Sequence, residues 1–172
     1  PHDVALVFSN VAEAAGLAAA QARGVATAVL DHRGQERAAF DTLVDALLRG
    51  AGISHVALAG YMRRLSPEFT AAWHGRMINI HPSLLPSFPG LDTHARALAG
   101  GVKLHGCTVH FVTDALDGGP IIAQAAVPVR DDDSVVTLAA RVLAEEHRIY
   151  PPALAALTAG RLRVENGVVR GG

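Results

Sequence analysis

The chain has 172 residues, half of them apolar, and a formal net charge of −1 with neutral histidines. This length suits one domain with a substantial core, so residues 1–172 are expected to form a single domain. The near-zero charge gives no electrostatic indication of binding to nucleic acid or to an acidic membrane surface, and no apolar run is long enough to span a bilayer. The expected partner is therefore a small molecule.

The cysteine content points to a reducing compartment. Cys107 is the single cysteine, so the chain has neither a disulfide framework nor a two-cysteine metal motif. Nothing in the sequence resembles a signal peptide. The expected location is the cytoplasm.

The first half of the chain alternates short apolar runs with helical patterns. Four buried strands are expected, because each run is short, continuously apolar and bounded by turn residues: residues 4–8, 25–30, 55–60 and 77–80. Apolar spacing predicts helices between them at residues 12–23 and 36–48. A further short helix should begin at Ser66-Pro67, which combines a hydroxyl cap with a proline at the first helical position.

The second half predicts antiparallel pairing. Residues 104–113 and 121–129 alternate β-branched and polar residues and lie close enough to pair as a hairpin. Asp92 should cap a helix that ends at Gly100. The longest helix should begin after Ser134 and break or kink at Pro151 and Pro152. A terminal hairpin is expected over residues 161–169.

These elements predict an α/β fold with three layers: a mostly parallel twisted sheet with helices on both faces, Rossmann-like, with an antiparallel strand and a C-terminal hairpin.

The stretch from Met77 to Leu91 is the candidate site. Asn79 and His81 are two residues apart, so both side chains leave the same face at the end of a strand, and three prolines then impose a stiff loop. An amide and an imidazole placed side by side can both donate hydrogen bonds to one developing oxyanion, as in acyl transfer. The alternative is that both residues satisfy local loop geometry.

Other polar residues leave alternatives open. Asp117, in a turn before two glycines, could hold an imidazole protonated, or it could simply form an Asx turn. The two glycines are expected to supply backbone conformations closed to other residues. Glu146 and Arg63 could bind a ligand or be solvated charges. The histidine spacings give no metal site, because His110 points away from His105 on a regular strand.

Two long motifs carry a family resemblance. Residues 79–90 (Asn-Ile-His-Pro-Ser-Leu-Leu-Pro-Ser-Phe-Pro-Gly) and residues 106–120 (Gly-Cys-Thr-Val-His-Phe-Val-Thr-Asp-Ala-Leu-Asp-Gly-Gly-Pro) resemble the folate-dependent formyltransferases. The likeness extends from residues 7–10 to residues 146–151, nearly the whole chain. It implies transfer of a formyl group from 10-formyltetrahydrofolate to the amine of glycinamide ribonucleotide, in purine biosynthesis, without a metal, by a monomer or homodimer.

The resemblance also implies roles for individual residues. Asn79 and His81 would stabilise the tetrahedral intermediate, and Asp117 would keep the imidazole charged. Glu146 and Pro82 would contact the glycinamide substrate. The folate pocket would be formed by apolar walls, backbone groups and arginines: Arg37, Met62, Arg63, Arg64, Leu65, Asn79, Val112 and Asp114.

One part of the family pattern is expected to be missing from this chain. Family members begin with a strand and a Gly/Ser/Asn loop at a helix start, which binds the substrate phosphate, and no such unit is found in residues 1–172. Two other enzymes share the motif: formyltetrahydrofolate hydrolases and methionyl-tRNA formyltransferases. A folate-binding or inactive scaffold protein is the alternative from a different class.

Overall fold

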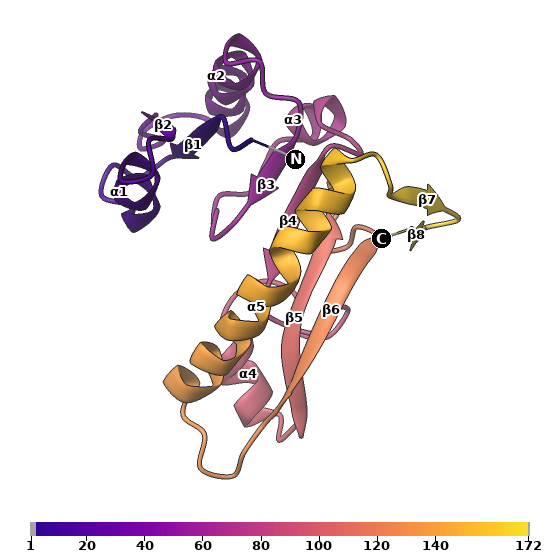
Figure 1. Ribbon diagram of the computed structural model, residues 1–172. Coiled ribbons are helices and arrows are strands. Elements are labelled where there is room, and N and C mark those ends of the chain that lie inside the picture. The colour runs from indigo at the N-terminus through magenta and orange to yellow at the C-terminus, as the bar shows by residue number, and fades with distance from the viewer. Residues whose placement is uncertain (1–2, 172) are drawn as a thin grey trace.

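The computed structural model describes residues 3–171. Its helices and strands lie close to the predicted positions and follow in this order: β1 (Leu6–Ser9), α1 (Ala15–Gln21), β2 (Ala26–Val29), α2 (Arg37–Gly50), β3 (Val56–Leu58), α3 (Pro67–Ala72), β4 (Met77–His81), α4 (Thr93–Ala99), β5 (Leu104–Phe111), β6 (Ile121–Pro128), α5 (Val135–Thr158), β7 (Arg163–Glu165) and β8 (Val168–Arg170) (Figure 1).

The strands combine parallel and antiparallel pairs. β1 pairs with β2 and β3 pairs with β4 in parallel, whereas β5 runs antiparallel to both β4 and β6. The predicted α/β class, the β5–β6 pair and the C-terminal hairpin of β7 and β8 are confirmed. The sequence did not predict that β5 would also pair with β4. Within residues 3–171, the β1–β2 pair is not hydrogen-bonded to the four strands from β3 to β6.

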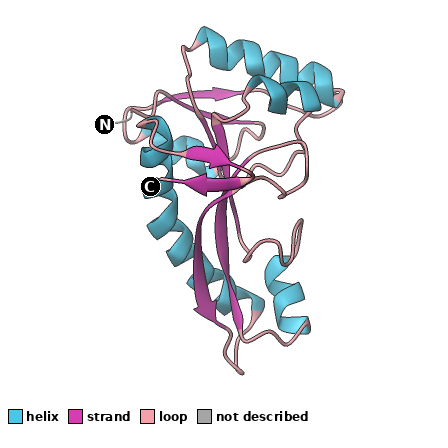
Figure 2. Cartoon of the chain, turned by 90° about the vertical axis from the view of Figure 1, so that its right-hand side faces the viewer, coloured by secondary structure: helices cyan, strands magenta, loops and turns pink. Residues whose placement is uncertain are grey.

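Two apolar cores lie on opposite faces of the β3–β6 sheet. Ile78 packs in the core under α5, whereas Met77 packs in the core formed with α2 and α3, as the alternation of side chains along a strand requires. Figures 1 and 2 show α5 lying along one face, with α2 and α3 gathered at the upper end of the molecule. The Met77 face therefore also carries Asn79 and His81.

Tyr150 ties α5 to the strands that carry the candidate site. Its hydroxyl lies 2.6 Å from the carbonyl oxygen of Leu58 at the end of β3 and 3.2 Å from that of Ile78 in β4. Burial raises the pKa of this phenol, so it remains a hydrogen-bond donor. The contact fixes the two parallel strand ends relative to the long helix.

Two helix starts use the predicted caps. The Ser66 hydroxyl accepts from the Phe69 N–H at the start of α3, with Pro67 at the first helical position. Ser134 and Thr137 form a reciprocal capping box at the start of α5. Each cap satisfies N–H groups that the helix itself leaves without partners.

Two predictions about helix ends were wrong: the side-chain cap at Asp92, and the break in the longest helix, one of the two outcomes expected at Pro151 and Pro152. Asp92 has a left-handed backbone (φ +56°) and its side chain makes no capping hydrogen bond, because a cap needs the extended backbone that directs the side chain at the first N–H groups. Pro151 and Pro152 do not break α5, which continues to Thr158. Buried residues on both sides of the prolines, such as Ile149 and Ala153, pack into the core and offset the lost hydrogen bonds.

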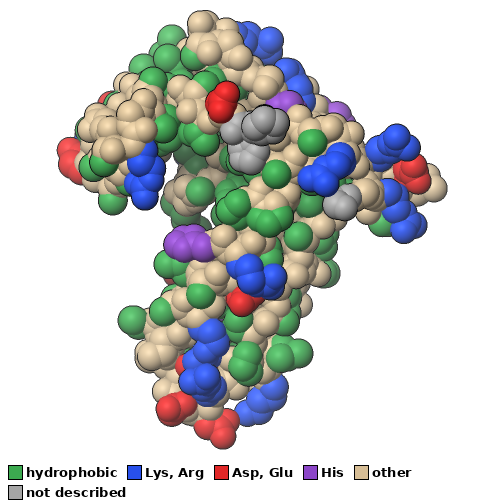
Figure 3. All heavy atoms as spheres, viewed as in Figure 1, with side chains coloured by type: hydrophobic (Ala, Val, Ile, Leu, Met, Phe, Trp, Pro, Cys, Tyr) green, Lys and Arg blue, Asp and Glu red, His purple; other side chains and the backbone are tan. Residues whose placement is uncertain are grey.

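Charged side chains of both signs are scattered among apolar ones on the face seen in Figure 3, and this face is hollowed between the β1–β2 lobe and α5. No helix within residues 3–171 is long and apolar enough to cross a membrane.

Candidate active site

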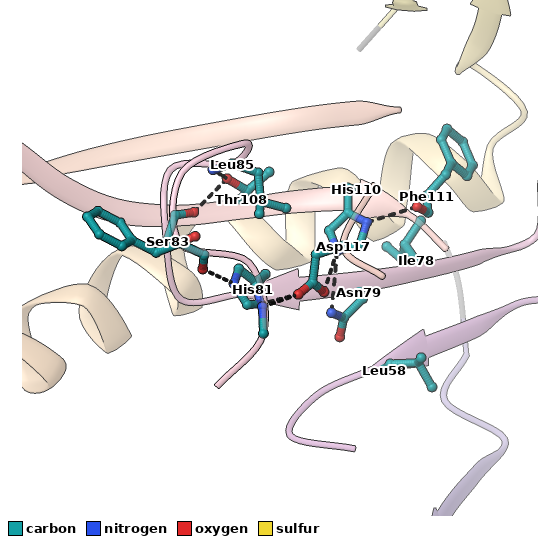
Figure 4. Close-up of polar contacts among 12 residues, drawn as sticks. Leu58, Ile78, Asn79, His81, Ser83, Leu85, Thr108, His110, Phe111 and Asp117 are labelled. Carbon is teal, nitrogen blue, oxygen red and sulfur yellow. Dashed lines mark hydrogen bonds and ion pairs between the residues drawn. The ribbon is translucent and has the colours of Figure 1, made fainter. Parts of the chain in front are cut away.

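The end of β4 places the two predicted oxyanion donors on one face. In the antiparallel register Asn79 lies opposite His110 and His81 lies opposite Thr108, so residues from both strands point the same way. His81 is buried, with 6% of its surface exposed. Figure 4 shows Asn79, His81, His110 and Asp117 converging from β4, β5 and the turn after β5.

Both ring nitrogens of His81 face hydrogen-bond acceptors. Nε2 lies 3.0 Å from the carbonyl oxygen of Phe88, and Nδ1 lies 3.5 Å from Oδ2 of Asp117. A carbonyl and a carboxylate can only accept, so both contacts are satisfied together only when the ring carries two protons. The Nδ1 contact is the longer of the two, so this nitrogen is the one able to reach a further acceptor.

Asp117 is held by the loop that follows β4. Its Oδ2 accepts from the Gly90 N–H at 2.8 Å, its Oδ1 lies 3.9 Å from Nε2 of His110, and its backbone is left-handed (φ +50°). Gly118 and Gly119, which follow Asp117, were expected to supply backbone conformations closed to other residues, and this prediction was wrong because neither has a positive φ. A Cβ on Gly119 would lie 1.8 Å from the carbonyl oxygen of Phe111, so glycine is needed there for close approach to β5.

His110 is a site residue that the sequence analysis did not assign. Its Nδ1 lies 2.9 Å from the carbonyl oxygen of Phe111 and therefore carries the hydrogen, and burial lowers the pKa of His110 although Phe111 and Asp117 oppose this. In the neutral ring Nε2 is an acceptor, and it lies 3.4 Å from Nδ2 of Asn79. His110 thus turns the Asn79 amide so that its NH₂ group faces the site. Side-chain alternation places His110 on the same face of β5 as Thr108, but its partner Asn79 follows only from the register of β4 and β5.

A buried hydroxyl shapes the loop after His81. Oγ1 of Thr108 donates to the carbonyl oxygen of Ser83 at 2.7 Å and accepts from the Leu85 N–H at 3.0 Å. It also accepts from the Gln124 side chain at 3.0 Å, and this amide donates to the carbonyl oxygen of Leu85 as well. The proline-rich loop is therefore fixed to β5 and β6.

A cleft of about 100 Å³ opens beside Asn79, His110 and Asp117. Most of the predicted folate-pocket residues line it: Arg63, Arg64, Leu65, Asn79, Val112 and Asp114. Two do not. Arg37 is exposed at the start of α2, and Met62 is 72% exposed.

The cleft wall contains polar atoms suited to a ligand with hydrogen-bonding edges. The Tyr61 hydroxyl and Oγ1 of Thr113 are buried and have no partner among the described residues. Burial raises the pKa of Tyr61 to about 12, so its hydroxyl remains a donor. Arg63, in contrast, uses its guanidinium on the carbonyl oxygens of His32 and Gln35. Arg64 is therefore the arginine of the wall better placed to meet an anionic group.

The predicted substrate residues lie outside this cleft lining. Pro82 is half-buried directly after His81, and Glu146 is half-buried on α5. Burial raises the pKa of Glu146, although the charges of His147 and His81 oppose this.

Among the described residues, the histidines do not form a set of three metal ligands. Within residues 3–171 no group of three or more His, Cys, Asp or Glu side chains is arranged to hold a metal ion. His105 instead contacts His94, with Nε2 and Nδ1 3.2 Å apart.

Comparison with known proteins identifies the class. Residues 1–154 match the formyl transferase family, and the chain belongs to this family. Individual relatives with high sequence identity include phosphoribosylglycinamide formyltransferases. The chain is 48% identical to phosphoribosylglycinamide formyltransferase of Escherichia coli over 162 residues, which cover 94% of the chain and 76% of that enzyme.

A solved structure and a longer relative are also similar to this chain. The fold matches glycinamide ribonucleotide transformylase 1 from Symbiobacterium toebii with a TM-score of 0.94 and 49% identity, covering 97% of this chain and 79% of that one. The trifunctional purine biosynthetic protein adenosine-3 of Bos taurus is 48% identical over 95% of the chain. The chain spans only 16% of that protein's length.

Proposed function

We propose that the protein transfers the formyl group of 10-formyltetrahydrofolate to the amine of glycinamide ribonucleotide, a step of de novo purine biosynthesis. The observation that carries the proposal is the arrangement of Asn79 and Asp117 at the cleft, with Nδ1 of His81 3.5 Å from the Asp117 carboxylate. The 48% identity to the Escherichia coli enzyme supports the choice of acceptor. A cytoplasmic location and a reaction without a metal belong to the same proposal.

The geometry suggests how the bonds change. The amine attacks the formyl carbon, and the carbonyl oxygen becomes an oxyanion that accepts from the Asn79 amide and the charged His81 ring. The carbon–N10 bond then breaks, and His81 supplies the proton that the folate nitrogen takes up. The proton lost by the amine can return to the imidazole through Asp117. No net proton is consumed.

The cleft would hold the folate. Its apolar wall includes Leu65 and Val112, and the unpartnered Tyr61 and Thr113 oxygens suit the polar edge of a heterocycle. Arg64 would meet the glutamate carboxylates, because a guanidinium pairs with a carboxylate through two donors. Glu146 would bind the substrate amine by its carboxylate.

The test offers the full-length protein three acceptors: glycinamide ribonucleotide, water and charged initiator tRNA. We expect formyl transfer to glycinamide ribonucleotide, and loss of at least 100-fold in His81→Ala with folate affinity nearly unchanged. His74→Ala, which replaces an exposed histidine, is the matched control. Turnover with water or tRNA as the acceptor would identify one of the alternative enzymes. Tight folate binding without turnover would indicate a scaffold protein. Equal rates of formyl transfer in wild type and His81→Ala would refute the proposal.

A further inference from the structure

The loop from Phe88 to Leu91, hereafter the strap, contacts both ionisable groups of the site. The carbonyl oxygen of Phe88 accepts from Nε2 of His81 at 3.0 Å, and the N–H of Gly90 donates to Oδ2 of Asp117 at 2.8 Å. The strap thus orients the imidazole and the carboxylate through backbone groups. Its own position decides where those two side chains lie.

The strap adopts a conformation that its sequence does not favour. Phe88 has φ +53°, in the left-handed region that costs a bulky residue roughly 1 kcal/mol or more. This backbone accompanies the orientation of its carbonyl oxygen toward His81. Such a conformation persists only when surrounding contacts hold it.

Arg96 on α4 supplies those contacts. Its Nη1 donates to the carbonyl oxygens of Pro89 at 2.6 Å and Leu91 at 3.2 Å. Its guanidinium lies 5.6 Å from the centre of the Phe88 ring, and His105 meets the same ring edge-on at 6.0 Å. One arginine therefore binds the strap on both sides of Gly90 and packs on the aromatic ring before it.

We infer that Arg96 is a positioning residue, which holds the strap so that its Phe88 carbonyl and Gly90 N–H fix His81 and Asp117 for proton transfer. Arg96 is not among the residues that line the cleft, so it acts through the strap and not on the folate. This inference rests on the proposed function for its kinetic consequence.

The kinetic test compares Arg96→Met with wild type in the full-length protein. A small displacement of a catalytic pair lowers the rate without weakening binding, so we expect kcat to fall about tenfold while the folate KM stays within about twofold. Arg96→Lys, which keeps a donor for the carbonyls, should recover part of the loss. Arg23→Met is the matched control, because Arg23 also donates to a backbone carbonyl, that of Ala19, on the distant helix α1.

A second readout does not need turnover. Amide hydrogen exchange at Gly90 should be slow in wild type, because this N–H is bound to the nearly buried Asp117 carboxylate, and about tenfold or more faster in Arg96→Met. The inference would be overturned if Arg96→Met left both kcat and the Gly90 exchange rate unchanged. It would also be overturned if the fall in kcat came with an equal rise in KM, or if both Arg96→Met and Arg96→Lys lost the folded state. A wild-type protein without formyl transfer would refute the proposed function, while the exchange measurement would still decide the role of Arg96.

Discussion

Replacing Asp117 by asparagine should separate the charge of this side chain from its shape. The asparagine oxygen can still accept from the Gly90 N–H, but the negative charge 3.5 Å from Nδ1 of His81 is lost. Two charges at this distance interact by about 5 kcal/mol at an effective dielectric constant of about 20. Because the asparagine dipole recovers part of this interaction, we expect a loss of about 2 to 4 kcal/mol, or roughly 30- to 1000-fold in kcat.

The loss of activity in Asp117→Asn should also depend on pH. The proton that the ring donates to the folate nitrogen is no longer stabilised by a neighbouring carboxylate, so the remaining activity of Asp117→Asn should rise as the pH is lowered. The assay is the initial rate of formyl transfer between pH 5.5 and 8.5, with folate affinity measured separately and expected to change little. Asp132→Asn, an equal charge change at an exposed position, is the control. A variant that keeps more than one third of wild-type kcat at every pH would refute the reasoning.

Three further predictions concern stability, measured as the free energy of unfolding in urea. Thr108→Val removes a buried hydroxyl that makes three hydrogen bonds and should cost about 2 to 4 kcal/mol; a cost below about 1 kcal/mol would contradict this. Burial lowers the pKa of His105 from 6.5 to about 4. Below pH 6.5 the unfolded chain therefore takes up a proton that the folded protein does not. The free energy of unfolding should fall by up to roughly 3 kcal/mol as the pH drops to 4. His105→Gln should flatten that dependence, and an equally steep curve would exclude His105 as its source. Gly119→Ala should destabilise through its clash with Phe111, whereas Gly16→Ala, in open space on α1, should be neutral or stabilise by up to about 1 kcal/mol; similar effects of the two would contradict the close-approach argument.

Local sequence patterns predicted much of the architecture. The positions of the short apolar strands, the caps at Ser66 and Ser134 and the terminal hairpin each depend on neighbouring residues, and the structure confirms them. The burial expected of residues 25–30 was wrong, because Ala26 and Val29 at the two ends of β2 are exposed. The prediction at the prolines of α5 failed because core packing on both sides of them outweighed local preference. The prediction at Asp92 failed because its backbone is left-handed and does not direct the side chain at the first N–H groups.

The sequence alone determined that Asn79 and His81 would leave one face of a strand end, because side chains alternate along every strand. Only the tertiary structure decided what they meet. The antiparallel register of β4 and β5 brought His110 beside Asn79, and the path of the strap, held by Arg96, placed a carbonyl oxygen against His81. Strand pairing and the direction of a loop carbonyl depend on residues far apart in the chain, and no local pattern contains them.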